Sequence, residues 1–278
     1  MEWVVLVTSA AVTVLAVWLL VPLLLRTMGL HKHFAAPRRN LEGKRALVIA
    51  TSHDTLGDTG KKTGVFASEM TAPYYTFADA GMSVDVASIK GGKIPLEPMS
   101  MQWPLKSSHD TRFMGDADLR RKVDQSKAIS EIDPSTYDAV FLAGGWGAAF
   151  DFEQSRELGK LLQQADDAGA VIGGVCHGPL GLLAAKSGNG HPLVNGKRLT
   201  AVTDKQVREL GIIHTPRHPE RDLRAAGAVF DSSTRFRDLF ASHVVADGRL
   251  VTGQNQNDGA ETADRMMQVI LATPAHRD

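Results

Sequence analysis

The chain contains one cysteine, Cys176, and the residues around it are typical of a nucleophile. Residues 174–178 read Gly-Val-Cys-His-Gly, which is the G-x-S-x-G pattern with cysteine in place of serine. Glycine on both sides allows a sharp turn from a strand into a helix, and this turn presents the nucleophile at the end of the strand. A cysteine placed there can attack a carbonyl carbon as its thiolate. The pattern predicts a cysteine nucleophile, and a buried packing cysteine is the alternative.

Two features beside Cys176 could activate its thiol. Residues 179–185 read Pro-Leu-Gly-Leu-Leu-Ala-Ala, and a proline in the first turn is typical of a helix start. The positive end of that helix dipole would point at the sulfur and favour the thiolate. His177 follows in the chain and could act as the base, although a histidine at a helix start with no catalytic part fits the residues equally well.

A mostly parallel sheet is predicted to carry this turn. Four runs are apolar throughout and typical of strands, at residues 45–52, 83–88, 139–144 and 170–176. Helices are predicted at residues 64–80, 154–168 and 258–271. Strands that are apolar on both sides and alternate with helices indicate an α/β fold whose sheet is covered on both faces.

The remaining segments are less regular. Residues 90–136 are rich in Met, Pro, Lys and Asp, and their weak periodicity predicts an insertion near the rim of the active site rather than part of the core. Residues 199–203 are predicted as another short strand. Residues 243–253 carry an Ala-Asp-Gly-Arg turn between two apolar runs, which predicts a hairpin.

Residues 1–28 are predicted as a transmembrane anchor. Residues 3–25 form an uncharged run that, at about 1.5 Å per residue, is long enough for the roughly 30 Å hydrocarbon core of a bilayer. A cleaved signal peptide is the alternative, but it would have a basic start and a shorter apolar stretch. Residues 29–43 are predicted as a basic, loosely structured linker.

The basic residues near the anchor all follow its apolar run: Arg26, Lys32, Arg38, Arg39, Lys44 and Arg45. By the positive-inside rule, this distribution predicts a single-pass membrane protein whose following domain lies in the cytoplasm. A periplasmic domain is the alternative. A reducing compartment also suits a free cysteine.

The overall composition excludes several classes of protein. The 31 basic residues balance the 31 acidic ones and only 6% of the residues are aromatic, which argues against a nucleic-acid partner. One cysteine excludes an internal disulfide and a cysteine-based zinc site. His214 and His218 are four residues apart, but Pro216 between them prevents a regular helical ligand pair. We therefore predict no catalytic metal and no cofactor.

Four sequence blocks together resemble the PfpI superfamily, which also contains the Parkinson-linked deglycase and has the class I glutamine amidotransferase fold. The blocks are Thr-Gly-Val-Phe at 63–66 followed by Glu69, Ala-Gly-Gly-Trp-Gly at 143–147, Val-Cys-His-Gly-Pro at 175–179, and Asp-Gly-Arg-Leu-Val-Thr-Gly-Gln-Asn at 247–255. The closest resemblance is to the heat-inducible holding chaperones with glyoxalase III activity. It implies one domain over residues 44–272 with a flavodoxin-like sandwich.

The resemblance also implies roles for particular residues. Cys176 is the nucleophile with His177 beside it, and Glu69 is the carboxyl group that hydrogen-bonds the sulfur. Without the resemblance, Glu69 would pass as a solvated glutamate on a helix. A glutamate held close to the sulfur is expected to be protonated and to relay protons during turnover. The backbone N–H groups of Gly145 and Gly147 are expected to hold an oxyanion.

Two positions depart from the family pattern. Trp146 stands where the glycine-rich turn usually has histidine, which could alter how a substrate fits. Val207 aligns with the acid that commonly orients the elbow histidine. Asp204 and Glu209 are the candidate substitutes for that acid, and without either of them the catalytic group is a dyad.

The resemblance favours a cofactor-free lyase of the glyoxalase III type, which converts methylglyoxal or a related 2-oxoaldehyde into a hydroxy acid. The same nucleophile could instead serve a deglycase, an amidase or a peptidase. A membrane-tethered holding chaperone, or a stress sensor in which Cys176 is oxidised, is an alternative of a different class. The predicted partners are the small aldehyde and the lipid bilayer, and the family implies that the chain can form a homodimer.

Overall fold

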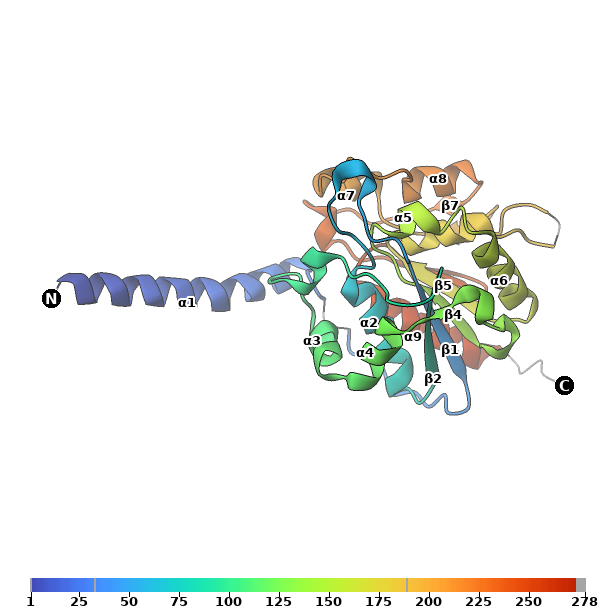
Figure 1. The fold of residues 1–278 in the computed structure, drawn as a ribbon, viewed down its shortest axis with the longest axis horizontal. Helices are drawn as coiled ribbons and strands as arrows, with labels where there is room; N and C mark the ends of the chain where they lie inside the picture. The colour runs from blue at the N-terminus through green and yellow to red at the C-terminus, as the bar shows by residue number, and fades with distance from the viewer. Residues whose placement is uncertain (1, 33, 189, 274–278) are drawn as a thin grey trace.

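The computed structural model describes residues 2–32, 34–188 and 190–273. A long N-terminal helix, α1 (Glu2–Met28), projects from an α/β body that contains the rest of the described chain (Figure 1). The body has a central sheet with helices on both of its faces, as the sequence predicts.

The central sheet has seven strands in the order β3-β2-β1-β4-β5-β9-β8. Neighbouring strands are parallel, except that β8 and β9 form an antiparallel hairpin. The strands are β1 (Arg45–Ala50), β2 (Ser83–Ser88), β3 (Lys127–Ala128), β4 (Ala139–Leu142), β5 (Val171–Val175), β8 (Val244–Asp247) and β9 (Leu250–Gly253). The predicted parallel sheet and the predicted hairpin are both confirmed.

Alternate residues of each strand face opposite layers of helices, which explains why the strands are apolar throughout. In β1, Ala46 and Val48 pack into one core cluster, while Leu47 and Ile49 pack into the other. The first layer contains α2 (Ala67–Asp79), α3 (Ser108–Gly115), α4 (Ala117–Asp124) and α9 (Gly259–Ala272). The second layer contains α6 (Arg156–Asp167), α8 (Pro219–Ala225) and the 3-10 helix η5 (Gly178–Ala184).

Shorter elements connect these layers. β6 (Arg198–Leu199) and β7 (Val229–Phe230) form a separate two-stranded parallel sheet, so the strand predicted at 199–203 is shorter than expected and lies outside the main sheet. The other short helices are η1 (Gly57–Thr59), η2 (Pro98–Met101), η3 (Ile129–Glu131), η4 (Pro134–Thr136), α5 (Ala148–Asp151), α7 (Asp204–Glu209) and η6 (Asp238–Phe240).

The prediction that residues 90–136 stay outside the core is wrong. Ile94, Phe113, Leu119 and Val123 are buried in the cluster beneath the first layer, and β3 adds an edge strand beside β2. The reason is that α3 and α4 have eight residues each, so neither is long enough to show a clear apolar period in the sequence.

The linker at residues 29–43 has no helix or strand in its described part, but it is docked on the body rather than loose. Leu30 and Leu41 are buried. The Arg39 guanidinium donates to both carboxylate oxygens of Asp264 in α9, at 2.6 and 3.0 Å. The basic charge that marked this segment in the sequence therefore serves in part to hold it against α9.

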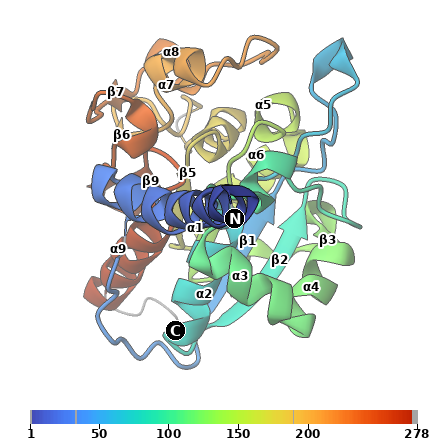
Figure 2. The same ribbon diagram turned by 90° about the vertical axis from the view of Figure 1, so that its left-hand side faces the viewer.

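Helix α1 presents its apolar side chains to the outside of the structure. Its segment Val7–Met28 has a mean hydropathy of 2.3 over its most apolar window, and none of that window is buried. Figure 1 shows the helix projecting away from the body, and Figure 2 views it nearly along its axis. Near the body, Trp18 stacks on Trp103, with ring centroids 5.7 Å apart. By length and composition alone the helix is able to cross a membrane.

Candidate active site

Cys176 lies at the carboxyl end of β5 in the sharp turn that the sequence predicts. Its φ is +58°, a left-handed conformation that a residue with a side chain rarely adopts. The turn needs glycine at 178, because a Cβ there would collide with the carbonyl oxygen of Leu142 in β4. The strained backbone and the tight approach of β4 together fix the direction of the sulfur.

The helix after Cys176 differs in type from the one that the sequence predicts, and burial rather than the helix dominates the pKa of the thiol. The segment after His177 is the 3-10 helix η5, seven residues long, rather than an α-helix. Burial raises the pKa of the Cys176 thiol well above its usual range, and the neighbouring Glu69 carboxyl acts in the same direction. The resting group is therefore a thiol, and its proton must be removed during the reaction.

Glu69 lies in the first turn of α2, and only 1% of its surface is exposed. Burial raises its pKa well above the usual range, hydrogen bonding to the Cys176 thiol and to the backbone of Gly145 opposes the rise, and the charge of Asp258 adds to it. The carboxyl fills the space left by Gly144, where a Cβ would collide with its Oε2 atom. Glu69 is thus a neutral acid held against the sulfur, in the position that the family resemblance implies.

His177 is completely buried, and its Nδ1 atom lies 3.4 Å from the sulfur of Cys176. Burial, followed by the positive charge of His218, lowers its pKa to about 3. The imidazole is therefore neutral, and its Nδ1 atom can accept a hydrogen bond from the thiol. Its Nε2 atom is also buried and has no hydrogen-bond partner in the described part of the chain.

The backbone groups that face the sulfur differ from those predicted. The N–H groups of His177 and Gly145 both lower the pKa of the thiol, so both point at the sulfur. The N–H of Gly147 instead donates to the carbonyl of Gly64, at 3.2 Å, so its predicted oxyanion role is wrong. The contribution of His177 was foreseeable, because the residue after an elbow nucleophile donates its N–H in other elbow enzymes.

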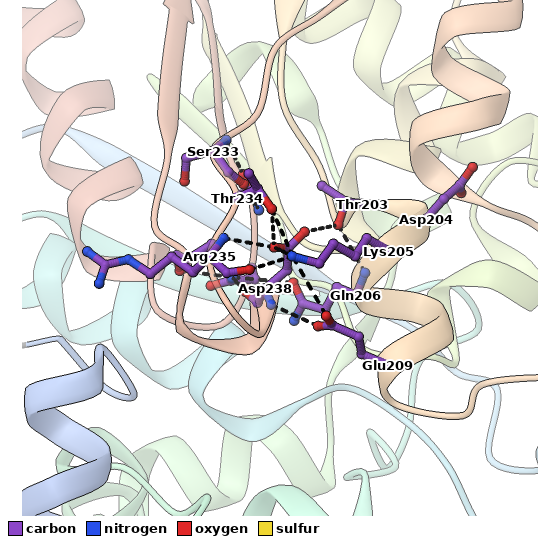
Figure 3. Close-up of polar contacts among 12 residues, drawn as sticks. Thr203, Asp204, Lys205, Gln206, Glu209, Ser233, Thr234, Arg235 and Asp238 are labelled. Atoms are coloured by element: carbon purple, nitrogen blue, oxygen red, sulfur yellow. Dashed lines mark hydrogen bonds and ion pairs between the residues drawn. The ribbon is translucent and has the colours of Figure 1, made fainter.

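The structure places the two candidate orienting acids away from His177. Glu209 accepts the backbone N–H of Asp238 at 2.8 Å and lies 3.8 Å from Lys205. Figure 3 shows these three residues in one polar cluster around Asp238, with Asp204 pointing away from it. Neither acid hydrogen-bonds Nε2 of His177, and within residues 2–32, 34–188 and 190–273 no other carboxyl group does so.

Asp258 is a buried carboxyl group near the site that sequence reasoning missed. It begins α9, and its Oδ2 atom accepts three backbone N–H groups, from His243, Gln254 and Asn255, at 2.9–3.2 Å. Burial nevertheless raises its pKa to about 6, since the hydrogen bonds offset only part of the cost of burying the charge. Its sequence context, Asn-Asp-Gly before a helix, is the usual signal for a cap and gave no hint of burial beside Glu69.

Asp258→Asn is expected to remove a destabilisation that appears as the pH rises. In the folded protein the pKa of Asp258 is raised from 3.8 to about 6. The protonated carboxyl therefore makes its full contribution to stability below pH 3.8, and this contribution is lost as the pH rises through 6. This rise corresponds to about 3 kcal/mol at most. We therefore expect the free energy of unfolding of the variant, measured with urea in mild detergent, to increase relative to that of the wild type between pH 4 and pH 7. A stability difference that is the same at every pH would contradict this assignment.

The described residues contain no group of three or more His, Cys, Asp or Glu side chains placed to hold a metal ion. The described residues at the sulfur supply a thiol, a neutral carboxylic acid, a neutral imidazole and two backbone N–H donors. This set can add a thiol to a carbonyl group and move protons between neighbouring atoms.

The DJ-1/PfpI family model matches residues 62–269, and the chain belongs to this family. Among curated proteins it is similar to the glutathione-independent glyoxalase of Saccharomyces cerevisiae, with 30% identity over 82% of this chain and 98% of that protein. Among solved structures it is similar to glyoxalase III from Candida albicans, with a TM-score of 0.74, 26% identity, and 81% of this chain and 97% of that chain covered. The Rapid Encystment Protein of Francisella tularensis superposes with a TM-score of 0.76 and 29% identity, over 82% of this chain and 99% of that one.

Proposed function

We propose that the chain is a glutathione-independent glyoxalase that converts methylglyoxal, or a related 2-oxoaldehyde, into a 2-hydroxy acid. The observation that carries the proposal is the buried contact of the Cys176 thiol with Nδ1 of His177 on one side and the neutral Glu69 carboxyl on the other. Two similar proteins, from Saccharomyces cerevisiae and Candida albicans, are named as glyoxalases.

The first step is addition of the thiol to the aldehyde. Nδ1 of His177 takes the thiol proton as the sulfur bonds to the aldehyde carbon, which produces a hemithioacetal alkoxide. The N–H groups of Gly145 and His177, which point at the sulfur, are close to where that alkoxide forms and stabilise its charge. Glu69 then gives its proton to the alkoxide oxygen and becomes a carboxylate.

The second step moves hydrogen between the two adjacent carbons. The Glu69 carboxylate takes the proton from the former aldehyde carbon while protonated His177 gives its proton to the ketone oxygen, which gives an enediol and a neutral imidazole. Glu69 then returns its proton to the neighbouring carbon and takes the hydroxyl proton from the former aldehyde carbon. The product is a 2-hydroxy thioester of Cys176. A water molecule, deprotonated by His177, hydrolyses the thioester and restores the thiol, so methylglyoxal plus water becomes lactic acid with no net oxidation or reduction.

Lactate formation tests the proposal directly. The purified full chain, incubated with methylglyoxal and no glutathione, should yield one lactate for each methylglyoxal consumed. Hydrolysis of glycated amines, amides or peptides at a higher kcat/KM would instead identify a deglycase, an amidase or a peptidase. Absence of turnover on all of these substrates, with a client protein still kept soluble, would favour the holding chaperone and overturn the proposal.

We also propose that α1 anchors the enzyme in a membrane with its catalytic domain on the cytoplasmic side. The exposed apolar surface of Val7–Met28 supports the anchor, and the basic residues that follow it support the orientation. Val12→Arg with Leu15→Arg should release the chain from membranes, because each arginine near the centre of the span costs about 3 kcal/mol. Val12→Leu with Leu15→Ile is the matched control. Extraction of the wild type by alkaline carbonate would contradict the anchor.

A further inference from the structure

A cavity of about 300 Å³ lies where the end of α1 and the linker after it meet the body. We call it the junction cavity. Its walls come from two sources: Arg26 and Lys32 belong to the end of α1 and the linker, while the other walls are the amino-terminal parts of α2, α3 and α9. Cys176 and His177 do not line it, so it is a separate feature of the molecule.

Three helix starts point the positive ends of their dipoles toward the junction cavity. Ser68 is the second residue of α2, Ser108 is the first residue of α3, and Ala260 is the second residue of α9, and all three line the cavity. The first N–H groups of a helix have no partner within the helix and carry a partial positive charge. Together with the full charges of Arg26 and Lys32, they make this cavity favourable for an anion.

Acidic groups near the junction cavity offset only part of this charge. Glu261 lies 3.6 Å from the amino group of Lys32. The carboxylate of Asp110 is buried and already accepts hydrogen bonds from the Thr71 hydroxyl and from the N–H and hydroxyl of Ser107, at 2.7–2.8 Å. Asp110 therefore serves to cap α3, and it does not line the cavity.

A buried hydroxyl group in the cavity wall has no partner. Ser68 is only 2% exposed, and its Oγ atom is buried with no hydrogen-bond partner among the described residues. A buried hydroxyl without a partner costs stability, and a ligand oxygen that accepts its hydrogen bond would remove that cost. The opposite wall is fixed, because the N–H of His31 donates to Oδ1 of Asn257 at 2.9 Å and the Asn257 amide donates to the carbonyl of Leu239 at 2.9 Å.

An apolar groove continues from the junction cavity along α1. A second cavity of about 210 Å³ shares Arg26 and His31 with it, and is lined further along by Trp18, Pro22 and Trp103. Trp18, Pro22 and Arg26 are four residues apart and so lie along one face of the helix. A polar cavity that opens into an apolar groove fits a molecule with an anionic head and an apolar chain, whereas a free phosphate would use the polar cavity alone.

We propose that the junction cavity binds the phosphate group of an anionic membrane lipid, whose acyl chain occupies the adjoining groove. Arg26 and Lys32 pair with the phosphate oxygens, and the Ser68 hydroxyl donates to one of them. This proposal rests on the proposed anchor: the apolar run before Arg26 is long enough for the roughly 30 Å hydrocarbon core, so the cavity lies at the level of the headgroups. The bound lipid would hold the body in one orientation at the membrane surface.

Lipid binding to the full chain in mild detergent, measured by native mass spectrometry, tests the proposal. We expect dioleoylphosphatidylglycerol to bind about tenfold or more tightly than dioleoylphosphatidylcholine, because the choline of the second lipid brings a positive charge to Arg26 and Lys32. Arg26→Gln should weaken binding of phosphatidylglycerol about tenfold, since it removes a charge-assisted hydrogen bond. Ser68→Ala should weaken it about fivefold without lowering the thermal stability of the lipid-free protein, because its hydroxyl has no partner to lose.

Arg38→Gln is the matched control, because Arg38 is an exposed arginine of the same linker that does not line the cavity, and this variant should bind phosphatidylglycerol as the wild type does. Equal binding of the two lipids by the wild type, or equal losses in Arg26→Gln and Arg38→Gln, would overturn the proposal. Thermal unfolding in the same detergent shows whether each variant is folded.

Glycerol phosphate, which has a phosphate but no acyl chain, separates a lipid from a soluble ligand. It should compete with phosphatidylglycerol only weakly, because it leaves the apolar groove empty. Competition at the same concentration as the lipid would assign the cavity to a soluble phosphate compound and overturn the proposal. If alkaline carbonate extracts the chain, the anchor fails, and the titrations in detergent still decide whether the cavity binds the headgroup.

Discussion

Replacement of Cys176 by alanine is expected to reduce the formation of lactate from methylglyoxal by about three orders of magnitude or more, because it removes the atom that bonds to the substrate. Alanine keeps the Cβ that the left-handed turn already tolerates, and the loss of one buried sulfur should cost about 1 kcal/mol of stability. The folded structure should therefore survive. Lactate production and the thermal unfolding curve of the same preparation are the two measurements.

Cys176→Ser is the second variant in this experiment. Serine keeps a hydrogen-bonding group beside Nδ1 of His177 and beside Glu69, but its hydroxyl is a far weaker nucleophile than a thiol in this neutral site. We expect it to be as inactive as the alanine variant. If either variant retains a tenth of the wild-type rate, the covalent mechanism is wrong. Glu69 and His177 would then have to move protons on an aldehyde that is bound without a covalent bond to the enzyme.

Glu69→Gln is expected to lower kcat by a factor of about 10² to 10⁴, the usual contribution of a general acid or base. Glutamine has nearly the same shape and can still donate a hydrogen bond to the sulfur, but it cannot take up a proton and give it back. Addition of the thiol should persist while hydrogen transfer between the two carbons stops. Single-turnover mass spectrometry should then show the hemithioacetal of Cys176 without its thioester.

Glu97→Gln provides the matched control for the glutamate substitution. Glu97 is also buried, and burial also raises its pKa, but its Oε2 atom accepts a hydrogen bond from the Thr63 hydroxyl at 2.7 Å. The variant makes the same chemical change outside the group of residues that touches the sulfur, so kcat should stay near the wild-type value. Equal losses in the two variants would show that a buried glutamate is needed only for folding.

The elbow and the sheet were predictable because their signals are local. The left-handed turn at Cys176 requires small neighbours within two residues, and the apolar strands of a parallel sheet are visible as short continuous runs. Glu69 was found only through the family resemblance, because a helical glutamate has no local mark of burial. The core residues of α3 and α4 were missed because each helix has only two turns.

The protonation states at the site could not be predicted from residue types. The position of Cys176 after a strand suggested a thiolate at a helix start, but complete burial beside Glu69 reverses the direction of the pKa shift. Asp258 is far from Glu69 in the sequence and influences it only because α9 packs against α2. Each of these effects depends on the dielectric surroundings and on distance, which are properties of the packed chain.

The sequence by itself determined the cysteine at the elbow, the turn that presents it, the α/β architecture and a helix apolar enough for a bilayer, since each depends on residue type and spacing over a short stretch. Only the tertiary structure decided which groups meet at the sulfur. The N–H of His177, and not that of Gly147, points at the sulfur, and Glu209 lies in a separate cluster around Asp238. Contacts between residues distant in the chain are set by how layers of helices pack on the sheet, and no local pattern encodes them.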